Sequence, residues 1–476
     1  MPRGARAVVL ALLFLLGAGG CAHGPRRVSR VHERTLLIAL DGVPFGLVSE
    51  LKKEGRFSEF QEPARVVSTF PSTSHSGFGG LFRPLGASPP PGYDREYYSY
   101  ADEKIIGFLS SIHPKNPHDF KNFFDYSRKT PLQKFWIYAA PGLSGRRDLE
   151  KIRRLVWSRG DDRPLFTYIG GTDGAGHVLG RKRLKRWLIF MDGYLQRMKA
   201  DYLRDFGQTL QISLYSDHGF HFIRRPNAVS QNRIENGLRR ERLHLAPNLK
   251  TPDRVVAVQW GNISGASLFV DETRVPDVAR VLAGTAGIDI TAYRSGEDII
   301  VLSQDGGRLH TARVSCTEGR RRCRYAPVDG DPLDYGDIVD SLRRKGRMDS
   351  HGFAASEDWF EATKDRRYPD ALYRLHDGFF SLVENPAPIL FSTEDDYEYG
   401  DVLTRIGAWF HGGLKGTHGG LFQEASAAFA MTTDSKVRLP SVLRYDQVMP
   451  YIVPHTNLPF RTLDVREGLK RAHRDF

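Results

Sequence analysis

Residues 36–42 read LLIALDG, five apolar side chains in a row followed by an Asp-Gly turn. A short, uninterrupted apolar run is typical of a buried parallel strand, because helices cover both faces of such a sheet. A helix is expected directly after it, over residues 45–53. Further outward, strands are expected at residues 66–70, 165–169, 210–215 and 425–431, and a long helix is expected at residues 182–206. This succession of strands and helices predicts an α/β fold.

Residues 250–345 follow a different pattern. A helix is expected at residues 273–282, followed by strands at 288–293, 298–303, 309–316 and 324–327. Short turns that contain glycine separate these strands, which is typical of antiparallel hairpins. We therefore predict a main core over residues 34–249 and 346–476, with a small α+β cap over residues 250–345 inserted into it.

The N-terminus has the pattern of a targeting signal rather than of a fold element. A basic start precedes an apolar run, residues 7–16, that is too short to span a membrane comfortably. Small residues then lead to Cys21, which resembles a bacterial lipoprotein signal. We expect a signal peptide over residues 1–20, a lipid on the Cys21 thiol and a linker over residues 21–33. The protein would be exported and membrane-anchored, in the bacterial periplasm or at the cell surface. An ordinary secretory signal and an uncleaved anchor are the alternatives.

The chain contains three cysteines. If Cys21 carries lipid, Cys316 and Cys323 remain as a pair, and they flank residues 317–322 between two predicted strands. A disulfide that closes the end of a hairpin is expected in an oxidising compartment. Two free thiols are the alternative.

The formal net charge is +12, and removal of residues 1–20 leaves +10 because it takes away Arg3 and Arg6. An excess of base favours acidic partners such as phosphorylated substrates or anionic lipid, although a solvated basic surface has the same composition. The basic clusters at residues 181–186 and 320–322 lack the interleaved aromatic side chains of a nucleic-acid groove. We therefore expect no nucleic-acid partner.

Carboxylates follow three of the predicted strands: Asp41, Asp173 and Asp217. In open α/β sheets ligands bind beyond the carboxyl ends of the strands, so these side chains should lie close together, where they would repel one another without cations. Histidines near glycines complete the set: His177, His218 and His418. Each motif alone is more often a turn or a cap, but their joint occurrence predicts a metal site. Aspartate and imidazole are ligands that suit zinc.

Five stretches in this order resemble the alkaline phosphatase superfamily, in particular its type I phosphodiesterase and nucleotide pyrophosphatase branch. They are residues 37–42 (LIALDG), 70–74 (FPSTS), 172–177 (TDGAGH), 216–219 (SDHG) and 416–419 (GTHG). The resemblance extends over residues 36–435, most of the chain. It implies an alkaline-phosphatase-like fold, in which helices lie on both faces of a mixed, mostly parallel sheet.

The resemblance also implies a metal-dependent hydrolase of phosphate esters that holds two zinc ions or other divalent metals. One ion would be bound by Asp173, His177 and His418. The other would be bound by Asp41, Asp217, His218 and the oxygen of the nucleophile. The substrate would be a phosphorylated small molecule or a lipid headgroup.

The nucleophile is expected to be a Ser or Thr at the N-terminus of a helix, where the helix dipole favours an alkoxide and an incoming phosphate. Aligning residues 70–74 with the family's Phe-Pro-Ser-x-Thr assigns it to Ser74. Aligning the overlapping Thr-Phe-Pro with the family's own assigns it to Thr69. We favour Ser74, both as the catalytic residue and as a metal ligand, because that alignment keeps the preceding strand in register. Ser72 and Thr73 are expected to cap the helix.

The sequence also departs from this branch, which usually follows its nucleophile with an Asn that contacts the phosphate. Residues 92–98 (GYDREYY) contain no Asn, and His75 is a further departure, for which a packed or solvated role is expected. The motifs predict a phosphodiesterase or nucleotide pyrophosphatase-like enzyme. Because of these departures, a phosphomonoesterase and a phosphonate hydrolase are alternatives. Residues 69–76 lack the Cys/Ser-x-Pro-x-Arg pattern of a sulfatase. The non-catalytic alternative is a lipid-anchored binding protein that keeps the metal site for structure.

Overall fold

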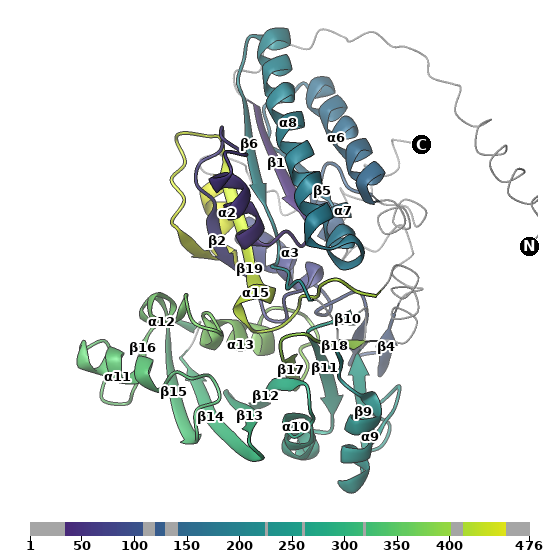
Figure 1. Cartoon of the computed structure of the whole chain (residues 1–476). Helices are drawn as coiled ribbons and strands as arrows, with labels where there is room; N and C mark the ends of the chain where they lie inside the picture. The colour runs from purple at the N-terminus through teal and green to yellow at the C-terminus, as the bar shows by residue number, and fades with distance from the viewer. Residues whose placement is uncertain are drawn as a thin grey trace, which may run out of the picture.

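The chain folds around two β-sheets (Figure 1). The structure, a computed structural model, describes residues 34–107, 120–128, 141–223, 227–258, 262–317, 320–400 and 413–453. The predicted signal peptide, Cys21 and the linker lie outside the described residues.

The first sheet has six strands. In order across the sheet they are β20 (Val442–Arg444), β2 (Ala64–Val67), β19 (Ala427–Thr432), β6 (Leu210–Tyr215), β1 (Arg34–Leu40) and β5 (Leu165–Ile169). β1 runs parallel to both β5 and β6, and β2 runs parallel to β20. β19 is antiparallel to both of its neighbours, so it alone runs against the others. The predicted mixed, mostly parallel sheet is confirmed.

Helices cover both faces of this sheet. One face packs against three of them: α2 (Phe45–Lys53), α6 (Pro141–Ser158) and α8 (Arg181–Phe206). The other packs against α3 (Ser74–Phe82) and α16 (Val448–Ile452). Strand β1 shows why helices can pack on both faces: successive side chains of a strand point to opposite faces, and over residues 36–40 of β1 both sets are apolar. Ile38 packs in the first layer, and Leu37 and Ala39 pack in the second.

The second sheet has nine strands and is mostly antiparallel. In order across the sheet they are β16 (Ala354–Ala355), β15 (Arg322–Asp329), β14 (Arg308–Cys316), β13 (Asp298–Asp305), β12 (Ile288–Ser295), β17 (Ile389–Thr393), β11 (Gly265–Val270), β9 (Arg254–Val258) and β8 (His244–Leu245). Most of it lies in the predicted insertion, residues 250–345. β8, β16 and β17 come from outside that range, so the sheet is more extensive than the small cap expected.

Shorter elements connect and flank the two sheets. The small strands are β3 (Tyr97–Ser99), β4 (Lys104–Ile106), β7 (Asn227–Ala228), β10 (Asn262–Ile263) and β18 (Tyr397–Gly400). The remaining helices are α7 (Gly171–Gly174), α9 (Gln231–Arg240), α10 (Val275–Ala283), α11 (Gly336–Arg344), α12 (Ser356–Thr363), α13 (Ala371–Phe380) and α15 (Gln423–Ser426). Helix α13 lies between the two sheets, where Gly378 packs against the Phe70 carbonyl oxygen.

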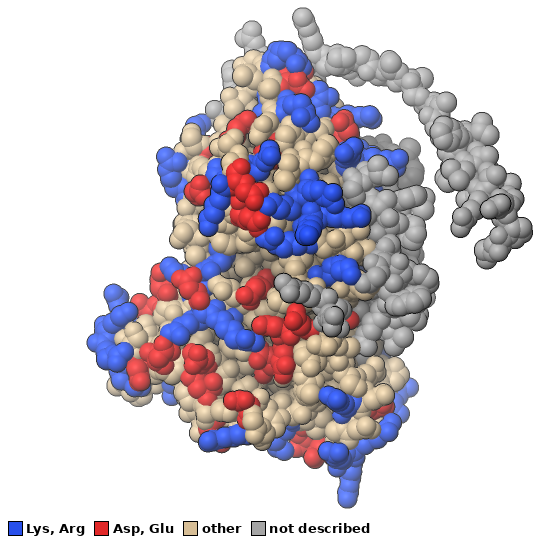
Figure 2. Space-filling model, in the orientation of Figure 1, with Lys and Arg blue, Asp and Glu red and all other residues tan. Residues whose placement is uncertain are grey.

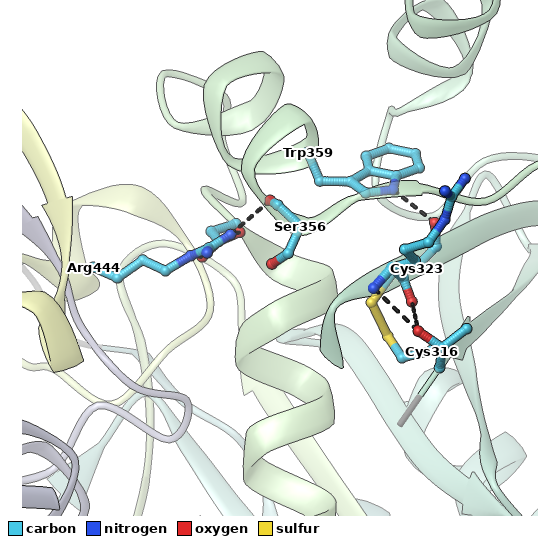
Figure 3. The surroundings of a disulfide bond; sticks show 8 residues. Cys316, Cys323, Ser356, Trp359 and Arg444 are labelled. Carbon is cyan, nitrogen blue, oxygen red and sulfur yellow. Dashed lines mark hydrogen bonds and ion pairs between the residues drawn. A yellow bond between two sulfur atoms is a disulfide. The ribbon is translucent and has the colours of Figure 1, made fainter. Parts of the chain in front are cut away.

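The expected disulfide between Cys316 and Cys323 is present, and it joins paired residues of β14 and β15 (Figure 3). Next to it, the Trp359 indole donates a hydrogen bond to the Cys323 carbonyl oxygen at 2.8 Å. On the other side of α12, Arg444 at the end of β20 donates to the Ser356 carbonyl oxygen at 2.7 Å. Helix α12 therefore links the closed hairpin to the first sheet.

The face drawn in Figure 2 carries both signs of charge, with Lys and Arg interspersed among Asp and Glu. Within the described residues, no helix combines the length and the apolar character that a membrane span requires.

Candidate metal centre

The carboxyl ends of three neighbouring strands bring the predicted carboxylates together. β1 lies between β5 and β6, so Asp41 after β1 has Asp173 on one side and Asp217 on the other. Gly42 forms the turn after Asp41 with a φ of +62°, and its N–H donates to Asp217 Oδ1 at 3.1 Å. A Cβ on Gly42 would lie 3.0 Å from Asp173 Oδ1, so this position needs glycine both for its backbone and for its space.

The first group of ligands consists of Asp173, His177 and His418, and it can hold a metal ion. Asp173 lies in the short helix α7, and a π-helical turn over Ala175–Leu179 places His177 beside it. The His177 Nε2 atom lies 3.2 Å from Asp173 Oδ1, and the His418 Nε2 atom lies 3.6 Å from the same oxygen. Two imidazole nitrogens and one carboxylate oxygen therefore meet at a single point, as zinc coordination requires.

The second group consists of Asp41, Asp217 and His218, and it can also hold a metal ion. The His218 Nε2 atom lies 3.5 Å from Asp41 Oδ1 and 3.4 Å from Asp217 Oδ2. The two groups adjoin each other, because the His218 and His418 rings stack with their centroids 3.8 Å apart. The structure thus brings together all six of the residues that the sequence singled out.

Backbone carbonyl groups fix the orientation of all three imidazole rings. The Nδ1 atom of His177 lies 3.0 Å from the Gly416 oxygen, that of His418 lies 2.9 Å from the Ser72 oxygen, and that of His218 lies 2.8 Å from its neighbour's oxygen. A carbonyl oxygen accepts only from a protonated nitrogen, so each neutral ring keeps its proton on Nδ1. Nε2 is then left as the lone-pair nitrogen that a metal binds.

The electrostatics of the centre favour a cation. Burial raises the pKa of Asp217 well above its usual value, and the nearby Asp41 carboxylate adds to the rise. Burial alone would lower the pKa of His218, but Asp217 and Asp41 outweigh it and raise the pKa to about 10. Asp217 Oδ2 and His218 Nε2 are both buried, and neither makes a hydrogen bond of ordinary geometry within the described residues. Such atoms are costly to bury unless a ligand, here a cation, satisfies them.

The two candidate nucleophiles occupy different environments. Ser74 is the first residue of α3, with Thr73 as its cap, and its hydroxyl donates to Asp41 Oδ1 at 3.0 Å. The Thr69 hydroxyl is buried and donates to the Pro71 carbonyl oxygen at 3.0 Å. Ser74 therefore faces the second ligand group, whereas Thr69 is committed to the loop that precedes the helix.

Two further residues, Arg374 and Ser264, contribute to the frame of the site, and no sequence pattern signals either of them. The buried guanidinium of Arg374 in α13 donates to the Thr69 carbonyl oxygen at 3.1 Å and to the Leu421 carbonyl oxygen at 2.7 Å. It thereby ties the loop before Ser74 to the loop after His418. The N–H of Ser264, which lies between β10 and β11, donates to the His418 carbonyl oxygen at 2.6 Å.

His75, the residue after Ser74 in α3, lies beside Asp94. His75 is packed rather than solvated, with its ring edge-on to Phe120 and its Nδ1 atom 3.5 Å from Asp94 Oδ1. Burial raises the pKa of Asp94 to about 6, although the N–H and the charge of Arg95 oppose the rise, and the Asp173 carboxylate adds to it. A carboxyl group therefore lies in the segment where the branch that the motifs resemble is expected to place an amide.

The raised pKa of Asp94 predicts a pH-dependent gain in stability for Asp94→Asn. The folded protein binds this proton more tightly than the unfolded chain, so its stability falls as the pH rises from about 4 to about 6. In metal-free protein, we expect the substitution to raise the free energy of unfolding by about 1–2 kcal/mol at pH 7.5. Urea denaturation at pH 7.5 and at pH 4 measures the difference.

Asp94→Asn should give no gain at pH 4, where the native carboxyl group is protonated. Asp162→Asn, at an exposed position, is the control and should change stability at neither pH. An equal gain for Asp94→Asn at both pH values would show that titration of Asp94 is not its cause.

No model of a known protein family matches the chain, and no curated protein matches it. Among solved structures, the chain is similar to murine ectonucleotide pyrophosphatase/phosphodiesterase 5, with 12% identity, a TM-score of 0.48, and 90% of this chain and 96% of that chain covered. The human protein gives 11% identity and a TM-score of 0.45, with 88% and 93% covered. An inactive murine variant in complex with AMP gives 11% and 0.47, with 90% and 96% covered. These proteins carry the name of the branch that the motifs resemble. At this level of similarity, the function of the centre rests on this chain's own residues.

Proposed function

We propose that the protein is a metal-dependent hydrolase of phosphate esters, with Ser74 as its nucleophile and two zinc ions in its active site. The observation that carries this proposal is the pair of adjoining ligand groups, whose Nε2 and carboxylate oxygen atoms face each other beside the Ser74 hydroxyl. Asp173, His177 and His418 would hold one ion, and Asp41, Asp217 and His218 would hold the other.

In the proposed reaction, Ser74 attacks phosphorus. When bound, the two cations would supply the positive charge that favours the serine alkoxide and offsets the charge on the phosphate. The N-terminus of α3 adds a favourable dipole at the same point. The Ser74 hydroxyl loses its proton to water, its oxygen bonds to phosphorus, and the bond from phosphorus to the leaving oxygen breaks as that oxygen takes a proton from water. Water then cleaves the phosphoserine and restores Ser74.

The substrate proposed first is a phosphodiester or a nucleotide-like pyrophosphate, and a phosphomonoester or phosphonate is the alternative. We further propose that the protein is exported and lipid-anchored through Cys21. The pattern of residues 1–21 supports this location, and so does the disulfide between Cys316 and Cys323, because disulfides persist in oxidising compartments.

Removal of metal should abolish activity reversibly. After dialysis against a chelator, hydrolysis of a chromogenic phosphodiester should fall by more than about 100-fold, since both the nucleophile and the phosphate lose their stabilising charge. Added zinc should restore it. Turnover and bound metal are measured on the same samples, with a chromogenic monoester alongside to rank the two substrate classes.

Two results would contradict the proposal. One is a wild-type protein that carries no metal and takes up none. The other is a protein that binds zinc but hydrolyses no ester under any condition, which would favour the non-catalytic alternative.

A further inference from the structure

Tyr168 makes a hydrogen bond to Asp41, one of the candidate ligands. It lies in β5, its side chain is buried, and its hydroxyl donates to Asp41 Oδ2. A phenol hydroxyl is a donor and an ionised carboxylate only accepts, so Tyr168 is the donor of this hydrogen bond. A Cβ at Gly170 would lie only 2.8 Å from this hydroxyl oxygen, so glycine at that position leaves it room.

An aromatic cluster holds the Tyr168 ring in place. Phe78, Phe120 and Phe124 surround it, with ring centroids 5.5, 5.5 and 5.3 Å from that of Tyr168. Phe78 belongs to α3, the helix that begins at Ser74. One side chain thus packs against the helix that carries the proposed nucleophile and also reaches a ligand of the second group.

The two oxygens of Asp41 have different partners. Oδ2 accepts from Tyr168, whereas Oδ1 accepts from Ser74 and lies 3.5 Å from His218 Nε2. A carboxylate that is free to rotate could turn either oxygen, or both, toward a cation. With Oδ2 occupied, only Oδ1 faces the second group and Ser74.

We propose that Tyr168 is a positioning residue, which orients Asp41 so that Oδ1 alone is offered to the second metal and to Ser74. This inference rests on the proposed function, because it assigns Tyr168 a role in the same centre. Hydrogen bonds to the far side of a ligand commonly change metal affinity by about 10–100-fold.

The test compares Tyr168→Phe with wild type in zinc binding, thermal unfolding and turnover. The substitution keeps the ring within its aromatic cluster and removes only the hydroxyl. We expect zinc binding, measured by competition with a chromogenic chelator, to weaken by about 10–100-fold at one of two sites. We also expect the thermal stabilisation by zinc to shrink and kcat to fall with little change in KM.

Tyr325→Phe is the matched control, because Tyr325 is a buried tyrosine of the second sheet whose hydroxyl donates to a carboxylate, that of Asp331. It should bind zinc as wild type does, so that a general cost of losing a buried hydroxyl is separated from a loss at the centre.

Zinc affinity and zinc stabilisation of Tyr168→Phe equal to those of wild type, in a wild type that does bind zinc, would overturn the inference and leave the proposed function standing. An equal loss of zinc affinity in both variants would also overturn it. A wild type that binds no zinc would overturn the proposed function and the inference together.

Discussion

Replacement of Ser74 by alanine should lower the turnover of a chromogenic phosphodiester by about 10⁴-fold or more, as loss of a covalent nucleophile does elsewhere. Ser74 is the hydroxyl at the start of α3 that contacts a candidate ligand, through Asp41 Oδ1 at 3.0 Å. The protein should still fold and bind zinc, because six ligands remain. Steady-state kinetics, zinc content and a thermal melt on one preparation check the three expectations.

Thr69 provides the matched control. Its hydroxyl donates to the Pro71 carbonyl oxygen, and its methyl group lies close to Gly80, 2.8 Å from where a Cβ on that residue would stand. Thr69→Ala should therefore cost about 1 kcal/mol of stability and change turnover only severalfold. Loss of turnover in Thr69→Ala with activity retained in Ser74→Ala would reverse the assignment. Full activity in both variants would remove the covalent serine mechanism.

The first sheet could be predicted because its strands can be recognised from local sequence patterns. Leu165–Ile169 is mostly apolar, and apolar residues alternate with polar ones over residues 210–214, before Tyr215. The predicted bounds of both strands match the observed ones, and the helix over Phe45–Lys53 also begins and ends as predicted. The strand expected over residues 66–70 instead spans Ala64–Val67. It pairs with β19, which lies more than 350 positions further along the chain, so no local pattern signals where the pairing begins and ends.

For the same reason, the sequence does not predict how many strands the second sheet contains. β17 inserts between β11 and β12, although it follows β12 by almost a hundred residues in the sequence. Hairpins such as β13 and β14 are recognised from the turn that joins them, whereas a strand that returns from far away is recognised only by its partners.

The grouping of the six candidate ligands could be predicted, since each side chain lies within two residues of a glycine, just past a strand or in a loop. The residues that orient them could not. Tyr168 occupies a strand position where an aromatic side chain signals only burial, and Arg374 lies in an ordinary amphipathic helix. The imidazole rings are fixed by backbone oxygens such as that of Gly416, and a carbonyl group has no sequence signature.

Asp217→Asn should nearly abolish both zinc binding at the second group and turnover. We expect zinc affinity there to fall by more than about 100-fold, beyond the range for residues that only orient a ligand. The Asp217 carboxylate is fully enclosed and its Oδ2 atom faces His218 Nε2 at 3.4 Å. An amide has the same shape, and its oxygen can still accept from the Gly42 N–H, so the loss is one of charge. Zinc titration and phosphodiester turnover measure it.

The same substitution should stabilise the metal-free protein, which separates a metal ligand from a structural residue. Burial raises the pKa of Asp217 and the Asp41 carboxylate adds to the rise, and together they outweigh the opposing charge of His218. Without a metal ion, the ionised group therefore penalises the folded state at neutral pH. Asp217→Asn removes that charge and should raise the free energy of unfolding of metal-free protein by about 1–3 kcal/mol, whereas zinc should no longer add stability. If the Asp217 carboxylate were structural instead, the substitution would lower the free energy of unfolding with or without metal. Urea denaturation with and without zinc decides between the two. Like charges buried together in a metal site are stabilised by the bound ion, and without the ion they destabilise the folded state.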